Sequence, residues 1–526
     1  MEFRVDGERF FPLGGQSHNS SAYNSAEIAS AISGVVALGG NTLEAPLYWE
    51  QIEPEEGTFE LATVGMLIEA CRDSGLKLIV LWFGTWKNGE MRYVPEWVKQ
   101  DQERFPRVIG FDRSPMQVLS SYAEPTREAD ERAFVAVCRE IARIDGSPQT
   151  VVAIQVENEP GILGSDRDYG PAAEQALREV VPQDLIAALG RHGAGPVHDQ
   201  WRSCGGKTGR NWISTFGIRG YEYREAWSIA RYIDSIAAAG RAHLDRPMYT
   251  NAWLGGDGWQ VPGFYPAGGP VAAVLDIWKA ATPHLDTIAP DIYLSNSERY
   301  RRVCADYHRT DNALFIPESG ANDANATNML RAIAEHDAIG FFCFAVDSVL
   351  DLEGRLRAGV ELFAASFAAV RAILPLVGRY RGTGSIHAIY HDSGAPFLPV
   401  TLEKYLGMVP AVDMGLLKDV KDHRHRRLPD RSTPPPFGLL VETGPHELYL
   451  AGSFHLHLVP NDPPGWLGAL RFPVIATPPD YLSVEEGRLN DDGTFTPTRK
   501  RNGDEVVFGG FWVAPDVGVV RVRLTP

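Results

Sequence analysis

The stretch Val151-Val152-Ala153-Ile154-Gln155-Val156-Glu157-Asn158-Glu159-Pro160 has the pattern that decides the fold. Its first residues are mostly apolar and β-branched, which is typical of a strand covered on both faces, as in a parallel sheet wrapped by helices. Polar residues follow at once, and a proline ends the run. In barrels of parallel strands the functional groups sit at the carboxyl ends of the strands. The stretch therefore predicts both a buried strand and a functional group at its end.

Short β-rich runs of this kind recur along the first part of the chain, with helical patterns between them. The expected strands are Phe10–Gly15, Asn41–Leu47, Lys77–Phe83, Val151–Val156, Pro247–Ala252, Thr287–Tyr293, Leu314–Pro317 and Gly340–Val346. The clearest expected helices are Ala26–Leu38, Ala62–Ser74, Glu128–Ile144 and Ala324–His336. Eight alternations of strand and helix favour a (β/α)8 barrel, the TIM barrel, over a doubly wound sheet.

The pattern changes after Gly378, where helical periodicity fades and Pro and Gly punctuate short β-rich runs. This is typical of an antiparallel β domain, and we expect a sandwich. The expected strands are Phe437–Glu442, Glu447–Leu450, Phe454–Leu458, Val506–Val513 and Val517–Leu524. The fold class is therefore α/β, with a (β/α)8 barrel over residues 1–378 and an antiparallel β-sandwich-like domain over residues 379–526.

Composition narrows the function classes. With 44% hydrophobic and 22% charged residues, the 526-residue chain can bury a large core. We see no apolar run near the roughly 20 residues that span a bilayer, so no membrane partner is expected. The net charge is −17 and the largest basic run is His423–Arg427, so no nucleic-acid partner is expected. The first residues show no signal peptide, which favours a cytoplasmic location unless a leader has been removed.

Two glutamates stand where barrel enzymes place their chemistry. Glu159 ends the fourth expected strand and Glu318 ends the seventh. A buried carboxylate is costly unless it is partnered, so two of them at strand ends favour a functional site over a structural ion pair. Paired carboxyl groups suit acetal cleavage, in which one group is protonated and the other ionised. Glu157 lies near the same face, and it either supports the barrel mouth or contacts a sugar.

These residues resemble a known class of enzymes. Asn158-Glu159 and Glu318 resemble the catalytic positions of the clan A retaining glycoside hydrolases. The segments 39–42 and 49–59 are similar to the second-strand signature of family 35 and family 42 β-galactosidases. Residues 5–21 and 83–89 resemble the bacterial family 35 branch that carries an additional C-terminal β domain. The resemblance covers essentially the whole chain.

The resemblance implies a role for individual side chains. Glu318 would be the nucleophile and Glu159 the acid/base, Asn158 would bind the sugar 2-hydroxyl, and Tyr293 would bind the nucleophile. The other expected substrate-binding residues, at or near strand ends, are Trp86, Asn88, Tyr48 and Asn19. Thr85 departs from the well-known family 35 enzymes, which have at that position an acidic residue that holds galactose hydroxyls.

The favoured function is a retaining exo-β-glycosidase, with β-galactosidase first among the activities. Its substrate partner would be a β-glycoside or oligosaccharide, and no metal or organic cofactor is expected because both carboxyl groups come from the protein. Enzymes of this kind are commonly oligomeric, which leaves a homo-oligomer open. The alternatives are a clan A β-glucosidase or transglycosidase, and a carbohydrate-binding barrel that has lost catalysis.

Overall fold

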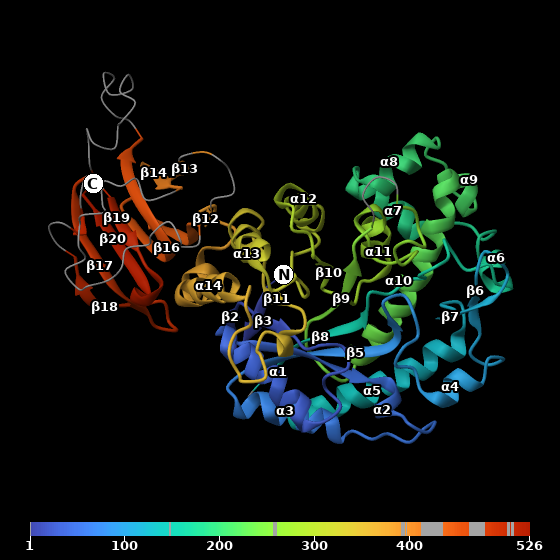
Figure 1. Ribbon diagram of the computed structural model, residues 1–526. Coiled ribbons are helices and arrows are strands. Elements are labelled where there is room, and N and C mark those ends of the chain that lie inside the picture. Colours follow the sequence, from blue (N-terminus) through green and yellow to red (C-terminus); the bar gives the residue numbers. More distant parts are fainter. Residues whose placement is uncertain are drawn as a thin grey trace.

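The computed structural model combines a barrel of parallel strands and helices with an antiparallel β domain (Figure 1). The described residues are 2–146, 149–255, 260–390, 395, 397–411, 435–461, 479–501, 505–506 and 510–525. The basic run His423–Arg427 lies outside them. Both parts of the predicted fold class, the TIM barrel and the antiparallel β domain, are therefore present.

The barrel contains a curled parallel sheet in the order β10-β9-β8-β5-β4-β3-β11. Its strands are β3 (Leu13–Gln16), β4 (Thr42–Tyr48), β5 (Lys77–Lys87), β8 (Val151–Asn158), β9 (Met248–Trp253), β10 (Thr287–Asp291) and β11 (Phe341–Cys343). The segment 314–319 closes this sheet between β10 and β11. The Ile292 N–H donates to the Glu318 carbonyl at 2.9 Å, and the Phe342 N–H donates to the Ile316 carbonyl at 2.8 Å. The expected seventh strand thus occupies its place in the barrel, although its pairing is too irregular for a regular strand.

Helices surround the sheet. The longer ones are α1 (Ser25–Leu38), α3 (Ala62–Asp73), α5 (Glu124–Ile144), α10 (Gly220–Arg241), α12 (Ser297–Tyr307), α13 (Asp323–Glu335) and α14 (Glu361–Tyr380). Shorter elements occupy the connections: α2 (Trp49–Ile52), α4 (Glu96–Gln100), the pair β6 (Arg107–Ile109) and β7 (Pro115–Leu119), α6 (Pro171–Ala176), α7 (Gln183–His192), α8 (Pro196–Ser203), α9 (Trp212–Phe216) and α11 (Leu275–Ala281). Local chemistry sets the bounds of α1, because the Asn24 side chain caps its first turn and Gly39, with φ 75°, ends it.

An N-terminal hairpin, β1 (Phe3–Val5) with β2 (Glu8–Phe10), lies at one end of the barrel. Phe3 is fully buried, and its ring contacts Phe315 edge-on at 5.3 Å. It joins an apolar cluster with residues near the beginnings of the strands, including Ile79 and Val152. The amino-terminal end of the barrel is therefore filled by apolar side chains, and a polar site belongs at the opposite, carboxyl-terminal end.

The β domain is built around one long strand. Its strands are β12 (Ile386–Tyr390), β13 (Phe397–Thr401), β14 (Tyr405–Pro410), β15 (Phe437–Gly444), β16 (Glu447–Pro460), β17 (Tyr481–Leu489), β18 (Phe495–Lys500), β19 (Gly510–Val513) and β20 (Val519–Leu524). The first half of β16 pairs with β15 and β20, and the second half pairs with β14 and β19. Apolar side chains from both halves form one core, which is the predicted sandwich-like arrangement.

The prediction of separate strands at 447–450 and 454–458 is wrong, because both belong to β16. Gly452 lies between them, opposite Gly438 on β15. A Cβ atom at Gly452 would lie 2.2 Å from the Phe437 carbonyl oxygen, and its φ of 139° is one that other residues rarely adopt. A glycine therefore continues the strand at the point where a sequence pattern suggested a break.

The expectation that no apolar segment approaches membrane-spanning length is wrong, because helix α14 does so. By length and composition alone, its 20 residues would suffice to cross a bilayer. Phe363 and Phe367 of α14 are buried in the barrel core, and the same cluster continues into Leu439 and Ala451 of the β domain. The apolar residues of α14 are thus in contact with both parts of the molecule, between which it lies (Figure 1).

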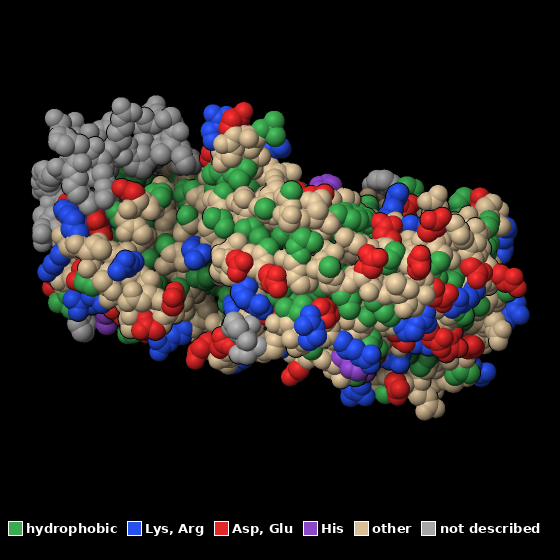
Figure 2. Space-filling view, turned by 90° about the horizontal axis from the view of Figure 1, so that it is seen from below, with side chains coloured by type: hydrophobic (Ala, Val, Ile, Leu, Met, Phe, Trp, Pro, Cys, Tyr) green, Lys and Arg blue, Asp and Glu red, His purple; other side chains and the backbone are tan. Residues whose placement is uncertain are grey.

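The surface carries charges of both signs. On the face shown in Figure 2, Lys and Arg side chains are interspersed with Asp and Glu over the described residues. Such mixing gives this face no extended basic stripe of the kind that polyanions require. On this face the acidic side chains are therefore spread among the basic ones.

Candidate active site

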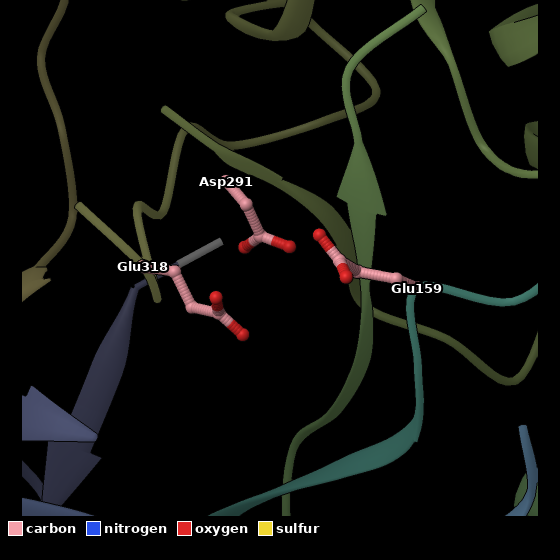
Figure 3. A group of neighbouring side chains, drawn as sticks. All are labelled: Glu159, Asp291 and Glu318. Carbon is pink, nitrogen blue, oxygen red and sulfur yellow. The ribbon is translucent and has the colours of Figure 1, made fainter. Parts of the chain in front are cut away.

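Three carboxyl groups converge at the carboxyl-terminal ends of the barrel strands (Figure 3). Glu159 directly follows β8, Asp291 is the last residue of β10, and Glu318 lies in the closing segment. One oxygen from each of the three lies within 4.8 Å of the others. Their exposed fractions are only 6%, 3% and 4%, so their charges interact with little screening by water.

Glu318 is surrounded by neutral hydrogen-bond donors. Its Oε1 accepts from Gln16 Nε2 at 3.1 Å, Asn158 Nδ2 at 3.2 Å and Asn251 Nδ2 at 3.3 Å. Its Oε2 accepts from the Tyr293 hydroxyl at 2.7 Å. Donors that point at a carboxylate stabilise its charged form. Glu318 accepts in all four of these bonds, which is the hydrogen-bonding role of a carboxylate, and Oε2 is the less heavily engaged oxygen.

Glu159 lies in the opposite kind of environment. Burial, and then the charge of Glu318, raise the pKa of Glu159 to about 8, although Lys87 and a hydrogen bond with Asp291 oppose this shift. A carboxyl group with this pKa is protonated at neutral pH. The site thus combines an ionised carboxylate with a protonated carboxylic acid nearby, which is the division of roles that acid-assisted nucleophilic chemistry needs.

The backbone around Glu159 is strained. Its φ is 43°, and Glu157 two residues earlier has φ 64°, a region that residues with side chains seldom occupy. Asn251 holds this turn, because its Oδ1 accepts the Glu159 N–H at 2.7 Å. Strain of this kind persists only where the surroundings fix it, and it is concentrated at functional sites. The turn brings the Glu159 carboxyl group toward Asp291 and Glu318 (Figure 3).

Glu157 is bonded to the backbone of the neighbouring strand. Its carboxylate accepts the Thr85 N–H at 3.0 Å and the Trp86 N–H at 2.7 Å. The Thr85 hydroxyl in turn donates to Asp130 at 2.7 Å, and Glu157 and Asp130 are both fully buried. Two roles were considered for Glu157, and these contacts match the one in which it supports the barrel mouth.

Lys87, the last residue of β5, orients the amide of Asn158. Its Nζ donates to Asn158 Oδ1 at 3.0 Å, while the Nδ2 of the same amide donates to Glu318. Lys87 also donates to Asn88 Oδ1, so Asn88 joins the network through the lysine. Because the two ends of the Asn158 amide have different partners, its orientation is fixed.

Tyr48 and Trp86 lie in aromatic packing beside this network. Tyr48 is fully buried and stacks on Tyr23 with ring centroids 4.0 Å apart, and its hydroxyl accepts the Ala22 N–H at 3.2 Å. Trp86 is 1% exposed and contacts Tyr232 edge-on at 4.9 Å. Neither ring presents appreciable surface to a sugar in this arrangement.

The structure thus brings together four of the expected residues directly: Glu159, Glu318, Asn158 and Tyr293. Asn88 is connected to them through Lys87. Asn19 is half-buried just after β3, and within the described residues no hydrogen bond joins it to Glu159 or Glu318. The expected sugar contacts of Trp86, Asn88, Tyr48 and Asn19 remain predictions.

Sequence reasoning missed four members of the network: Gln16, Lys87, Asn251 and Asp291. All four lie at or near the carboxyl-terminal ends of barrel strands. The available signal was position alone, because a polar residue at such a strand end points toward the mouth. Two acidic strand ends were predicted in this way. Asp291 was missed because the expected strand continued to Tyr293, whereas β10 ends at Asp291.

The three carboxyl groups also have the spacing of a metal site. Carboxylate oxygens are the ligands that hard divalent cations prefer. In this arrangement three amides and a phenol already donate to Glu318. A cation at this position would have to displace them, so the geometry favours a carboxyl pair that acts through its own protons.

Comparison with known proteins places few constraints on activity. A family model described as a domain of unknown function (DUF5597) matches residues 363–511, which is less than a third of the chain. No curated protein sequence matches.

Several solved structures resemble the fold at low identity. The catalytic domain of a β-amylase from Paenibacillus polymyxa is 12% identical with a TM-score of 0.49, and the match covers 67% of this chain and 97% of that one. A β-galactosidase from Marinomonas ef1 is 12% identical with a TM-score of 0.48, covering 70% and 60%. An exo-β-1,4-mannosidase from Opitutaceae bacterium strain TAV5 is 16% identical with a TM-score of 0.42, covering 70% and 61%. The chain spans about three fifths of the length of the last two, and scores this low carry no assignment of activity.

Proposed function

We propose that this chain is a retaining exo-β-glycosidase in which Glu318 is the nucleophile and Glu159 is the acid/base. The observation that carries the proposal is the approach of their carboxyl oxygens to within 4.8 Å in opposite protonation environments. Retaining glycosidases place the two carboxyl groups about 5–5.5 Å apart, whereas inverting enzymes leave about 6.5–9.5 Å for a water molecule. The spacing favours direct attack by Glu318.

In the first step Glu318 attacks the anomeric carbon and forms a glycosyl ester. The bond from that carbon to the leaving oxygen breaks, and the leaving oxygen takes the proton of Glu159. Glu318 becomes neutral as an ester while Glu159 becomes a carboxylate. The raised pKa of Glu159, about 8, ensures that the proton is present at neutral pH.

In the second step Glu159 acts as the base. It removes a proton from water, the water oxygen attacks the anomeric carbon, and the ester bond to Glu318 breaks. Burial still raises the pKa of Glu159 in the ester, but loss of the Glu318 charge removes the second cause of the shift, so the pKa falls and the same group suits both roles.

Asn158 and Tyr293 would hold the nucleophile during these steps. Asn158 Nδ2 donates to Glu318 Oε1, and the Tyr293 hydroxyl donates to Oε2. Tyr293 is half-exposed although its hydroxyl reaches the buried carboxylate, so its ring is placed to meet an incoming sugar. Asn158 would also bind the sugar 2-hydroxyl, as the sequence resemblance implies.

The proposed substrate is a terminal β-galactoside, an assignment that rests on the sequence resemblance. Thr85 stands where the well-known family 35 enzymes have a sugar-binding acidic residue. It is buried, its hydroxyl donates to Asp130, and it does not replace a sugar-binding carboxylate. β-Glucosidase activity, transglycosylation and binding without turnover are the alternative outcomes of the test below.

The proposed function is tested with a panel of aryl β-glycosides that includes β-galactoside and β-glucoside, with products identified. We expect hydrolysis, and we expect a 2-fluoro glycoside to add one covalent sugar to Glu318, seen by mass spectrometry. Binding without covalent labelling, together with no turnover of any substrate, would favour a non-catalytic carbohydrate-binding barrel and overturn the proposal.

Azide rescue shows which of the two glutamates is the nucleophile and which is the acid/base. Glu318→Gly should lower turnover by about 10⁴-fold or more, because no covalent intermediate can form. Azide should restore turnover and give the α-glycosyl azide, since it attacks from the face of the missing carboxylate. Glu159→Ala should give the β-glycosyl azide instead, because azide then intercepts the intermediate on Glu318. The reverse pair of products would exchange the two roles.

A further inference from the structure

A third carboxyl group, that of Asp291, has no part in the two-carboxylate mechanism. It is 3% exposed, and one of its oxygens lies within 4.8 Å of an oxygen of Glu159. Two ionised carboxylates are both acceptors only, so a hydrogen bond between two carboxyl groups requires a proton on one of them. A proton on Asp291 would therefore turn the close approach of two like charges into a hydrogen bond.

The partners of Asp291 indicate which of its oxygens takes part in this contact. Asn251 Nδ2 donates to Asp291 Oδ2 at 2.8 Å, so Oδ2 has the acceptor role of a carbonyl oxygen. Oδ1 is buried and accepts from no donor. A proton on Oδ1 would satisfy this oxygen by donating to Glu159, and the carboxylic acid would then have every polar atom bonded.

The electrostatics agree with a protonated Asp291. Burial, and then the charges of Glu318 and Glu159, raise the pKa of Asp291 well above its usual range. The titratable groups around Asp291 are Glu159, Glu318, Glu44, Tyr249, Tyr293 and Tyr307. They are carboxyl groups and phenols, and the nearby cation Lys87 acts on Glu159. Ionisation of Asp291 would therefore add a negative charge beside others.

We propose that Asp291 is a positioning residue that stays protonated through the reaction and donates its O–H to Glu159. This inference rests on the proposed function. With Asp291 neutral, the three-carboxyl group carries one negative charge before the first step, on Glu318, and one charge after it, on Glu159. The charge moves between two residues without a change in total, and the hydrogen bond from Asp291 stabilises Glu159 once Glu159 is ionised.

The decisive comparison is between Asp291→Asn and Asp291→Ala. Asparagine reproduces a protonated aspartic acid, because its amide nitrogen can donate to Glu159 while its oxygen accepts from Asn251. We expect Asp291→Asn to keep kcat within about tenfold of the unmodified enzyme, and Asp291→Ala to lose about 100-fold or more, as with the loss of one preorganised donor. Equal damage by both variants would overturn the proposal, since it would mean that an ionised Asp291 is required.

A pH profile separates this role from a merely structural one. Because the Asp291 hydrogen bond lowers the pKa of Glu159, its removal in Asp291→Ala should move the alkaline limb of kcat/KM to higher pH. Asp291→Asn should leave that limb near its original position. An unmoved limb in Asp291→Ala would contradict a hydrogen bond to Glu159.

An infrared measurement addresses the proton without depending on activity. At neutral pH the difference spectrum between the unmodified protein and Asp291→Asn should contain the band of a protonated carboxyl group. A carboxylate band in its place would overturn the proposal. If the unmodified protein hydrolyses no glycoside and is not labelled covalently by any, the proposed function fails. The infrared result still reports whether Asp291 is protonated.

Discussion

The acidity of one side chain, Glu159, sets the pH range of the proposed reaction. Its pKa of about 8 means that the proton needed by the leaving group is present below that pH and lost above it. We expect kcat/KM for an aryl β-glycoside to fall as pH rises through about 8. A pH–rate profile measures this directly, and a decline beginning near pH 5 would contradict the assignment of Glu159 as the acid.

The same shift makes folding stability depend on pH. Because the pKa of Glu159 is raised in the folded state, its protonation contributes stability that is fully present below the unfolded-state pKa and is lost as pH rises through about 8. Glu159→Gln removes the ionisable group, so at pH 9 it should raise the melting temperature by about 2 °C while reducing turnover. Scanning calorimetry measures the difference, which should shrink at pH 5; a variant less stable than the unmodified protein at both values would contradict the shift.

At the scale of single residues, the sequence was sufficient to predict those side chains whose type is unusual for their position. Glu159 and Glu318 were recognised because a carboxylate at the end of a buried strand needs a reason. Gln16 and Asn251 were missed because a buried amide at a strand end is common, and only the fold reveals that both donate to Glu318.

At the scale of elements, the signature segment 49–59 turns out to hold a local turn. Glu53 accepts the Trp49 indole N–H at 2.9 Å and the Gly57 N–H at 2.8 Å. Both bonds lie within the segment and stabilise the turn after β4, and among the described residues no hydrogen bond joins Glu53 to the three carboxyl groups. A motif can thus identify a fold class through its structural residues as well as through its catalytic ones.

Strand positions were predictable because buried parallel strands are continuous apolar runs, as β5 and β8 show. Two features could not be predicted from local pattern. The segment 314–319 pairs irregularly because it forms only isolated bridges to β10 and β11. The strand β16 continues through Gly452 because Gly438 lies opposite, and that pairing joins residues far apart in the sequence.

This glycine pair gives a test of the β domain. Gly452→Ala should destabilise the protein by about 2 kcal/mol or more, because the new methyl group would meet the Phe437 carbonyl oxygen in an unfavourable backbone conformation. Denaturant unfolding of the full chain measures the loss. Gly444→Ala, where nothing lies within 4 Å of the added Cβ, is the matched control and should be nearly neutral. Equal effects would contradict the role assigned to the close approach.

At the scale of the whole molecule, the barrel and the β domain share a core. The apolar cluster of the barrel extends through α14 into Leu439 and Ala451. We still propose the division at residues 378 and 379, but the shared core makes the two parts interdependent in stability. The match of the family model from residue 363 onward likewise includes most of α14 with the β domain.

Two core truncations test this interdependence. Leu439→Ala removes a buried side chain from the shared cluster, whereas Leu456→Ala removes one from the separate core of the β domain. Each should cost about 2–5 kcal/mol locally. Hydrogen exchange should rise in both α14 and β15 for Leu439→Ala, and in the β domain alone for Leu456→Ala. Exchange in α14 that is unchanged by Leu439→Ala would mean that the two parts are energetically independent.

The N-terminal hairpin has a practical consequence. Phe3 fills the barrel end that lies opposite the three carboxyl groups, so the start of the chain and the site occupy opposite ends of the barrel. A tether attached at the amino terminus would anchor the molecule with its mouth directed away from the support. Immobilised in that orientation, the protein should keep the end of the barrel that holds the three carboxyl groups accessible from solution.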